Sequence, residues 1–155
     1  LKKQLLYYKD YAKKSIDQIF PETILSESKI FQVNLLVSVV LMSGPAGYQL
    51  IDLPLEGQYS PIYSLLVSDF DNDGIDDLIV GGNQFEVKPQ FGSYNASNGW
   101  YFKGVLNEGK FTFQSGIDLK ISGQIRDIEI VEVNGVKYVL FAKYDDELEI
   151  FKVAN

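Results

Sequence analysis

An acidic stretch in the middle of the chain holds the side chains best suited to chemistry. From residue 69 to 77 it reads Asp-Phe-Asp-Asn-Asp-Gly-Ile-Asp-Asp, with carboxylates at loop positions 1, 3, 5 and 9 and glycine at position 6. Calcium takes about six to eight hard oxygen ligands, and glycine adopts the sharp turn that a tight loop around an ion requires. Without a cation, such carboxylates would repel one another or bind protons at a raised pKa. The stretch therefore predicts a calcium site formed by Asp69, Asp71, Asp73, the Ile75 carbonyl and Asp77.

Three other interpretations of the acidic stretch are an EF-hand, a magnesium site and a solvated turn. An EF-hand needs glutamate at position 12 of the loop, where this chain has Val80. Magnesium keeps its waters and rarely accepts such a cage of protein ligands. A solvated Asp/Asn/Gly turn is common in β-hairpins, and it stays open as the alternative to a metal site.

The composition excludes several classes of function. The 155 residues contain no Cys and no His, so disulfides, zinc–thiolate sites, thiol nucleophiles and a Ser-His-Asp triad cannot form from this chain alone. The 14 Lys and Arg against 21 Asp and Glu give a net charge of -7, which repels nucleic-acid phosphates. The longest apolar stretch, 35–42, is far shorter than the roughly 18 residues that a membrane span needs. We expect no nucleic-acid partner and no membrane span.

The N-terminal segment has the pattern of an amphipathic helix. Apolar residues recur every three or four positions, and lysines occupy the other side. Pro21 disfavours the α conformation at Phe20, so the helix should end there and a short helical turn should follow through Leu25. We predict a helical segment over residues 1–28 that packs on the β domain; binding to a partner or a membrane surface is the alternative. The apolar stripe consists of Leu1, Leu5, Tyr8, Ala12, Ile16 and Ile19.

Residues 29–155 are predicted to form a domain of short antiparallel strands. Runs of β-branched and aromatic residues begin at Ile30, continue through Phe31 to Leu41 and then alternate with turns such as 44–47 and Asn134-Gly135. The strands fall into three blocks, at 29–53, 62–115 and 124–153, each typical of a propeller blade. The predicted fold is mainly β, with about three antiparallel blades of a β-propeller, partial or completed by other chains, after the N-terminal amphipathic helix.

The long polar segment 84–100 is where we expect a ligand to be recognised. It mixes aromatic side chains with Asn and Ser, a combination that suits sugar or peptide surfaces. The candidate ligand-binding residues are Phe85, Tyr94, Asn95 and Trp100. The alternative is an ordered loop whose aromatic side chains fill the core.

The stretch from Val67 to Gly81 resembles the calcium-binding repeat of the FG-GAP/VCBS family, whose repeats form blades of β-propellers such as the integrin α-subunit head. Segments 59–63, 92–99 and 123–128 are similar to the C-terminal part of large bacterial surface VCBS-repeat proteins related to the UnbV/ASPIC group. The resemblance implies a propeller portion with calcium held by the five residues named above. The turns at 44–47 and 134–135 lack the acid spacing, so the resemblance implies no metal there.

These observations predict a non-enzymatic, calcium-stabilised β-propeller module of a bacterial extracytoplasmic protein, at the cell surface, in the periplasm or secreted. Its partners would be calcium and a protein or glycan ligand, for adhesion or ligand binding. The chain begins with Leu1 and its opening lacks the apolar core of a secretory signal, so we interpret it as a piece of a longer or processed protein. Exposed blade edges should pair with missing blades or with a second copy.

The alternative function is a carbohydrate-binding or carbohydrate-active module. Two carboxylates can hydrolyse a glycosidic bond without histidine. Nothing in the sequence fixes the separation of any pair, and a solvated acidic surface explains the same residues. Arg126 is expected to pair with a neighbouring acid. The available carboxylates are Asp118, Asp127, Glu129, Asp145, Asp146 and Glu149.

Overall fold

The computed structural model describes residues 7–45 and 47–153. The chain divides into two compact units, Leu1–Leu36 and Val37–Asn155. Three residues used in the predictions above, Leu1 and Leu5 of the apolar stripe and Ala46 of the 44–47 turn, lie outside the described residues.

The described part of the first unit, from residue 7 on, contains three short helices, α1 (Tyr8–Tyr11), α2 (Ile16–Ile19) and α3 (Glu22–Glu27). The predicted continuous helix was wrong, because the chain leaves the helical conformation before Ser15. Ser15 is extended (φ -76°, ψ 165°), and its N–H donates to Gln18 Oε1 (3.2 Å), which starts a new helix instead of continuing the old one. The predicted stop at Phe20 and the short helix after Pro21 are both confirmed.

Residues 29–38 were predicted to begin the first strand, and this prediction was also wrong. The structure assigns no strand between α3 and Val39. The side chains of Ile30, Phe31 and Leu36 are 87%, 78% and 88% exposed. Their β-branched and aromatic character suits a sheet, but a strand forms only where a neighbouring strand accepts and donates its hydrogen bonds.

The second unit is built from short antiparallel strands, as predicted. Two 3₁₀ turns, at Leu55–Gln58 and Pro89–Phe91, lie in its loops. The strands are β1 (Val39–Gly44), β2 (Gly47–Asp52), β3 (Ile62–Ser68), β4 (Asp77–Gly82), β5 (Trp100–Phe102), β6 (Gly104–Asn107), β7 (Lys110–Phe113), β8 (Ile117–Asp118), β9 (Ile125–Val133), β10 (Val136–Lys143) and β11 (Glu149–Lys152).

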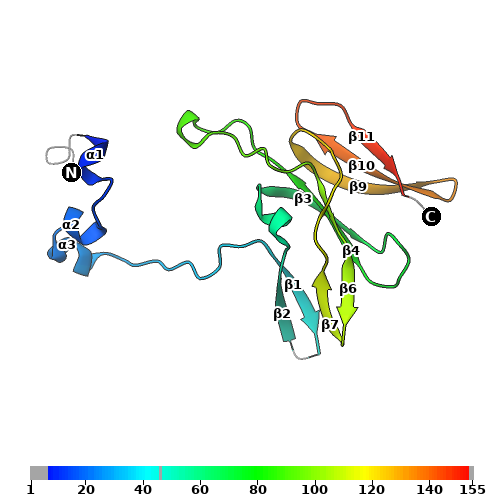
Figure 1. Cartoon of the computed structure of the whole chain (residues 1–155), viewed down its shortest axis with the longest axis horizontal. Coiled ribbons are helices and arrows are strands. Elements are labelled where there is room, and N and C mark those ends of the chain that lie inside the picture. The colour runs from blue at the N-terminus through cyan, green and yellow to red at the C-terminus, as the bar shows by residue number, and fades with distance from the viewer. Residues whose placement is uncertain (1–6, 46, 154–155) are drawn as a thin grey trace. The chain divides into compact units, whose positions relative to one another are not determined.

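These strands form a four-stranded sheet of order β3-β4-β5-β8, a three-stranded sheet of order β11-β10-β9, and the hairpins β1-β2 and β6-β7 (Figure 1). The mainly β, antiparallel architecture is therefore confirmed. The turn between β9 and β10 has the positive φ angles of a type I′ hairpin, 53° at Asn134 and 78° at Gly135. Such successive antiparallel sheets are typical of a partial propeller.

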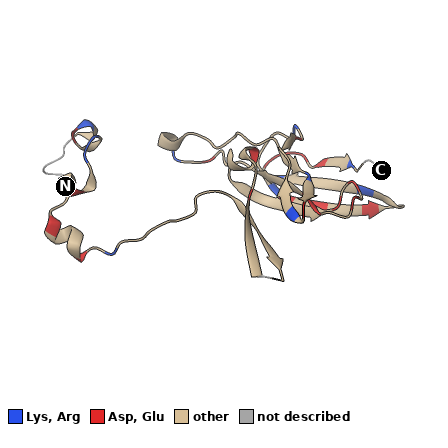
Figure 2. Ribbon diagram, turned by 60° about the horizontal axis from the view of Figure 1, so that its bottom comes forward, with Lys and Arg blue, Asp and Glu red and all other residues tan. Residues whose placement is uncertain are grey.

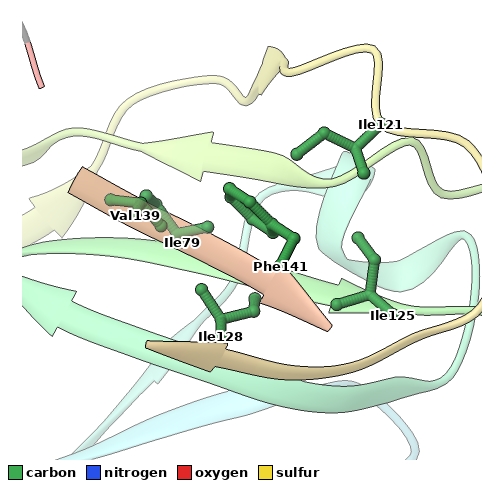
Figure 3. Packing of buried hydrophobic residues seen from close by; sticks show 6 residues of the cluster. All are labelled: Ile79, Ile121, Ile125, Ile128, Val139 and Phe141. Atoms are coloured by element: carbon green, nitrogen blue, oxygen red, sulfur yellow. The ribbon is translucent and has the colours of Figure 1, made fainter. Parts of the chain in front are cut away.

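Strand β4 lies in the middle of the hydrophobic core and is buried along its whole length. Ile79 contributes to one core cluster together with side chains of the β9–β10 region, and Figure 3 shows these side chains converging. Its neighbours Leu78 and Val80 belong to a second cluster with Leu53 and Phe102. Because successive side chains of a strand point to opposite faces, β4 supplies both clusters and holds the sheets on either side of it together.

The charged residues of the second unit follow no simple segregation along the chain. Figure 2 shows acidic positions in red and basic positions in blue, interspersed along the ribbon. Within the described part of the chain, no helix has the length and apolar character to cross a membrane.

Candidate metal centre

The acidic stretch forms the loop that joins β3 to β4. Two of its residues have a positive φ, Asn72 (59°) and Gly74 (86°), so the backbone turns sharply where glycine was predicted to permit it. Its carboxylates accept hydrogen bonds from the loop's own backbone. Asp69 Oδ1 and Oδ2 accept from the N–H groups of Asp73 (3.1 Å) and Gly74 (2.9 Å). The Ile75 N–H donates to Asp73 Oδ1 (2.9 Å).

Three carboxylates of the loop converge on one small volume. Asp69, Asp71 and Asp77 each offer an oxygen, and these oxygens all lie within 4.8 Å of one another. Calcium–oxygen distances are about 2.3–2.6 Å, so two ligands on opposite sides of one ion are separated by about 4.6–5.2 Å. The spacing of the three carboxylates therefore fits a single calcium ion.

Asp77 is fully buried at the first position of β4. Its Oδ2 accepts hydrogen bonds from the Phe70 N–H (3.2 Å) and the Tyr101 hydroxyl (2.8 Å), and its Oδ1 accepts one from the Gly104 N–H (2.9 Å). These donors are all uncharged. Burial, and then the neighbouring Asp77, raise the pKa of Tyr101, which keeps the phenol protonated as a donor. Asp77 thus ties the loop to β5 and β6.

Asp73 shares a cationic partner, Lys103, with one of the three converging carboxylates, Asp71. The Lys103 ammonium contacts Asp71 Oδ2 and lies 2.8 Å from Asp73 Oδ2. The hydrogen bond from Lys103, followed by the one from the Ile75 N–H, lowers the pKa of Asp73. The two aspartates in turn raise the pKa of Lys103. The outer side of the loop is therefore neutralised in part by a cation of the chain itself.

The residues present fit calcium as a ligand. Carboxylate oxygens are the hard ligands that it prefers, and the loop presents three at a suitable spacing with a fourth, Asp73, beside them. Ile75 takes part in the network through its N–H, while its carbonyl as a metal ligand stays a prediction. The resulting arrangement can hold a divalent cation.

Three residues that hold the loop were missed by the sequence reasoning, namely Tyr101, Lys103 and Gly104. All three lie at β5 or just after it. In the observed register Leu78 pairs with Phe102, which brings Lys103 opposite Asp77 and puts Tyr101 on the same face. A residue-by-residue alignment of β4 with β5 would have found them, but the long 83–99 segment between the two strands leaves that register undetermined in the sequence.

The candidate ligand-binding residues divide into two groups. Phe85 and Tyr94 are 42% and 45% exposed, Asn95 is exposed as well, and all three lie on the 83–99 segment, where Gln84 and Tyr94 exchange two backbone hydrogen bonds of 2.8 Å. Trp100 instead packs at the start of β5 against the second core cluster, with its ring centroid 6.2 Å from that of Tyr59. The structure therefore brings the first three together on one loop and places Trp100 in the framework.

Asn83 fixes the base of this loop. It is 2% exposed, and its Nδ2 donates to the carbonyls of Ser97 (2.6 Å) and Gly123 (2.8 Å). Its Oδ1 accepts from the Ser60 hydroxyl (2.8 Å) and the Ser97 N–H (3.0 Å). The amide uses its full hydrogen-bonding capacity, which holds both ends of the loop to the sheet.

Arg126 was expected to pair with an acid, and this was wrong. Its guanidinium donates to the Asn83 carbonyl (2.8 Å) and to Gln124 Oε1 (2.9 Å), and it stacks on the Tyr63 ring at 4.2 Å. Carbonyl acceptors and an aromatic face satisfy the guanidinium instead.

The carboxylates considered for glycoside chemistry have mainly local partners. Lys143 contacts both Asp146 (3.0 Å) and Glu149 (2.6 Å). Asp118 accepts from the Lys120 N–H (2.7 Å) and Asp127 from the Ile128 N–H (3.1 Å). Asp118 and Asp127 thus take part in local backbone contacts, and Asp146 and Glu149 in ion pairs.

Comparison with known proteins identifies the segment that contains the acidic loop. Residues 62–102 match the model of the FG-GAP repeat family, so the chain carries an FG-GAP repeat. The matched segment runs from the start of β3 to the end of β5 and includes Asp69, Asp71, Asp73 and Asp77. No match was found among curated proteins or among solved structures. The narrower likeness to bacterial VCBS and UnbV/ASPIC proteins stays a prediction.

Proposed function

We propose that this FG-GAP repeat chain is a calcium-stabilised, non-enzymatic β-propeller module that works outside the cytoplasm and binds a protein or glycan partner. The observation that carries the proposal is the convergence of Asp69, Asp71 and Asp77 within 4.8 Å, inside the matched repeat. Extracellular calcium modules bind the ion with dissociation constants of about 10⁻⁴–10⁻³ M, which suits a site of structural importance outside the cytoplasm.

The role proposed for calcium is structural. Asp77 is a buried carboxylate whose three donors are uncharged, and a buried anion that no cation contacts is costly. A calcium ion shared with Asp69 and Asp71 would supply the missing positive charge. It would also join the loop to β4, since Asp77 is the first residue of that strand.

The surface proposed for ligand binding is the exposed part of the 83–99 loop. Phe85 and Tyr94 present aromatic surface to solvent there, next to the exposed amide of Asn95. Aromatic and amide groups on a loop held by a rigid base suit a glycan or a peptide. Trp100, the fourth candidate, would support the loop from the framework instead of contacting the ligand. Among the described strands, β3 and β8 form the two edges of the four-stranded sheet, and such edges offer a surface for further blades or a second copy.

The first experiment is thermal unfolding of the full chain in chelator and across a calcium titration, with metal analysis of the purified protein. Binding to the folded state alone should raise stability by about 2.7 kcal/mol at a calcium concentration 100 times the dissociation constant. Asp71→Ala and Asp69→Ala should abolish the rise in Tm. Asp76→Ala is the matched control, because Asp76 is exposed, neighbours the site and carries the same charge.

The outcomes separate the parts of the proposal. A saturable rise in Tm with calcium supports the calcium site if it persists in Asp76→Ala and is lost in Asp69→Ala and Asp71→Ala. No rise and no bound metal would reduce the loop to a solvated turn. A glycan array with a hydrolysis readout then tests the alternative function, since product formation abolished by one acid-to-amide change would contradict a non-enzymatic module.

A further inference from the structure

Lys103 occupies the outer side of the acidic loop. Its ammonium bridges Asp71 and Asp73, and its side chain is 30% exposed against 38% and 32% for the two aspartates. Asp71 is also one of the three carboxylates that converge on the candidate calcium position. A single carboxylate therefore faces both the lysine and the position of the ion.

We propose that Lys103 is a built-in counter-ion that competes with calcium for Asp71 and Asp73. This inference rests on the calcium site of the proposed function and concerns how tightly that site binds. An ammonium and a divalent cation repel each other at contact distance. Calcium binding therefore requires the ammonium to leave Asp71, and the lysine lowers the affinity of the loop for the ion.

The backbone around Lys103 is held in place, so the exchange needs only a side-chain movement. The Lys103 carbonyl accepts from the Gln114 N–H (2.9 Å), and the next N–H, of Gly104, donates to Asp77 Oδ1 (2.9 Å). A Cβ on Gly104 would overlap the Asp76 carbonyl oxygen, so the chain here lies directly against the loop. The long lysine side chain can swing to solvent on this fixed base.

Two consequences follow from the competition. Without calcium, Lys103 neutralises part of the like charge of the loop and helps to keep it folded. With calcium bound, that contribution is replaced by the ion, so the gain in stability on calcium binding is smaller than in a loop without the lysine.

The test compares the full wild-type chain with Lys103→Met and Lys110→Met. Methionine keeps much of the lysine length and removes the charge. Lys110 is exposed at the start of β7, in the neighbouring hairpin, so its variant makes the same change in net charge away from the loop. Calcium affinity is measured by titration calorimetry in metal-free buffer, and Tm is measured in chelator and in saturating calcium.

Lys103→Met should bind calcium roughly 3- to 10-fold more tightly, the range expected for losing one or two partly exposed ion pairs. It should also melt at a lower temperature in chelator, so its calcium-dependent rise in Tm should exceed that of the wild type. Lys110→Met should match the wild type in calcium affinity and in the calcium-dependent rise in Tm. If Lys103→Met unfolds in chelator, its affinity is obtained from the calcium dependence of refolding, and tighter binding there supports the proposal equally.

The failures of the two proposals are distinguishable. If the wild type binds calcium through Asp71 and Lys103→Met binds it no more tightly, the competition is refuted and the calcium site stands. If Lys103→Met binds calcium and the wild type does not, the competition is supported and calcium stabilisation of the natural chain is refuted. If neither the wild type nor Lys103→Met binds calcium, the competition and the calcium site are both refuted.

Discussion

Asp77 differs from the other carboxylates of the acidic loop in being completely buried and in accepting hydrogen bonds from three separate donors. Its exposed neighbour Asp76 has the same charge and side-chain size, which makes the pair a direct comparison of a structural and a solvated aspartate. The hydrogen bonds of Asp77 therefore hold the loop against the sheet before any ion binds.

Asp77→Ala should therefore destabilise the protein in chelator as well as in calcium. The substitution removes the acceptor of the buried Gly104 N–H and of the part-buried Tyr101 hydroxyl, and a buried group without a partner costs about 1–3 kcal/mol. We expect a loss of roughly 2–5 kcal/mol in the free energy of unfolding by urea denaturation. Asp76→Ala should change it by less than about 0.5 kcal/mol. Equal effects would contradict the structural role of Asp77.

A second residue-level prediction concerns the turn after β10. The hydrogen bond from Lys143, and then the one from the Glu147 N–H, lower the pKa of Asp146 from its usual 3.8. A carboxyl whose pKa is lower in the folded state stabilises the fold fully above its unfolded pKa, and this contribution is lost as the pH falls through the folded pKa.

The difference in Tm between wild type and Asp146→Asn should consequently be constant from neutral pH down to about pH 5, and it should shrink below about pH 4. Asp145→Asn is the control, since Asp145 occupies the same turn and no ion pair involves it in the described part of the chain. A difference that grows on acidification would contradict the predicted sign.

At the scale of the elements, β4 depends on glycines that let other segments approach it. A Cβ on Gly82 would overlap the carbonyl oxygen of Pro61, and one on Gly81 would lie 2.5 Å from Ile125 of β9. The backbone of Pro61 cannot move away without disrupting the start of β3, whereas a side chain has some freedom to adjust.

Gly82→Ala should thus cost about 3 kcal/mol or more, near or above the upper end of the usual range for overpacking. Circular dichroism during thermal or urea unfolding measures the loss. Gly44→Ala is the control, because its nearest neighbour beyond the adjacent residues would be 3.8 Å away, an ordinary contact distance. A tolerated Gly82→Ala would refute the close approach of β4 to Pro61.

Local signals predicted the elements where the deciding interaction is itself local. Asn134-Gly135 specified its hairpin, and Pro21 ended α2, because turn and proline conformations depend on the residues themselves. The strand expected from Ile30 failed because strand formation depends on a partner elsewhere in the chain. The acidic loop could be predicted from the sequence. Its contact with Lys103 could not, because that contact depends on the register between β4 and β5, which tertiary structure sets.

At the scale of the whole molecule, the buried hydrophobic residues that the structure describes all belong to the second unit. The described buried hydrophobic residues run from Ile51 to Phe141, and the described residues of α1, α2 and α3 include no buried one. Helices of four to six residues are too short to be stable on their own in water.

A chain of residues 37–155 should accordingly fold cooperatively by itself, with the β-type circular dichroism spectrum and the calcium response of the full chain. Residues 1–36 alone should show little helix. The difference in Tm between the full and the shortened chain measures how much the helical segment stabilises the β domain, on which it was predicted to pack. A shortened chain without a cooperative transition would contradict the location of the core.

Two of the three donors that fix Asp77, and the ammonium that contacts Asp71, come from residues 101–104, which follow their partners by 24, 27 and 32 positions. The hairpin of β3 and β4 can form early, because its two strands are close in sequence. Its acidic loop lacks these contacts until β5 docks. In a chain that emerges N-terminus first, Asp71 and Asp77 therefore appear well before the residues of 101–104 that contact them. We expect these contacts to form late in folding, and we expect dissolved calcium to accelerate this step.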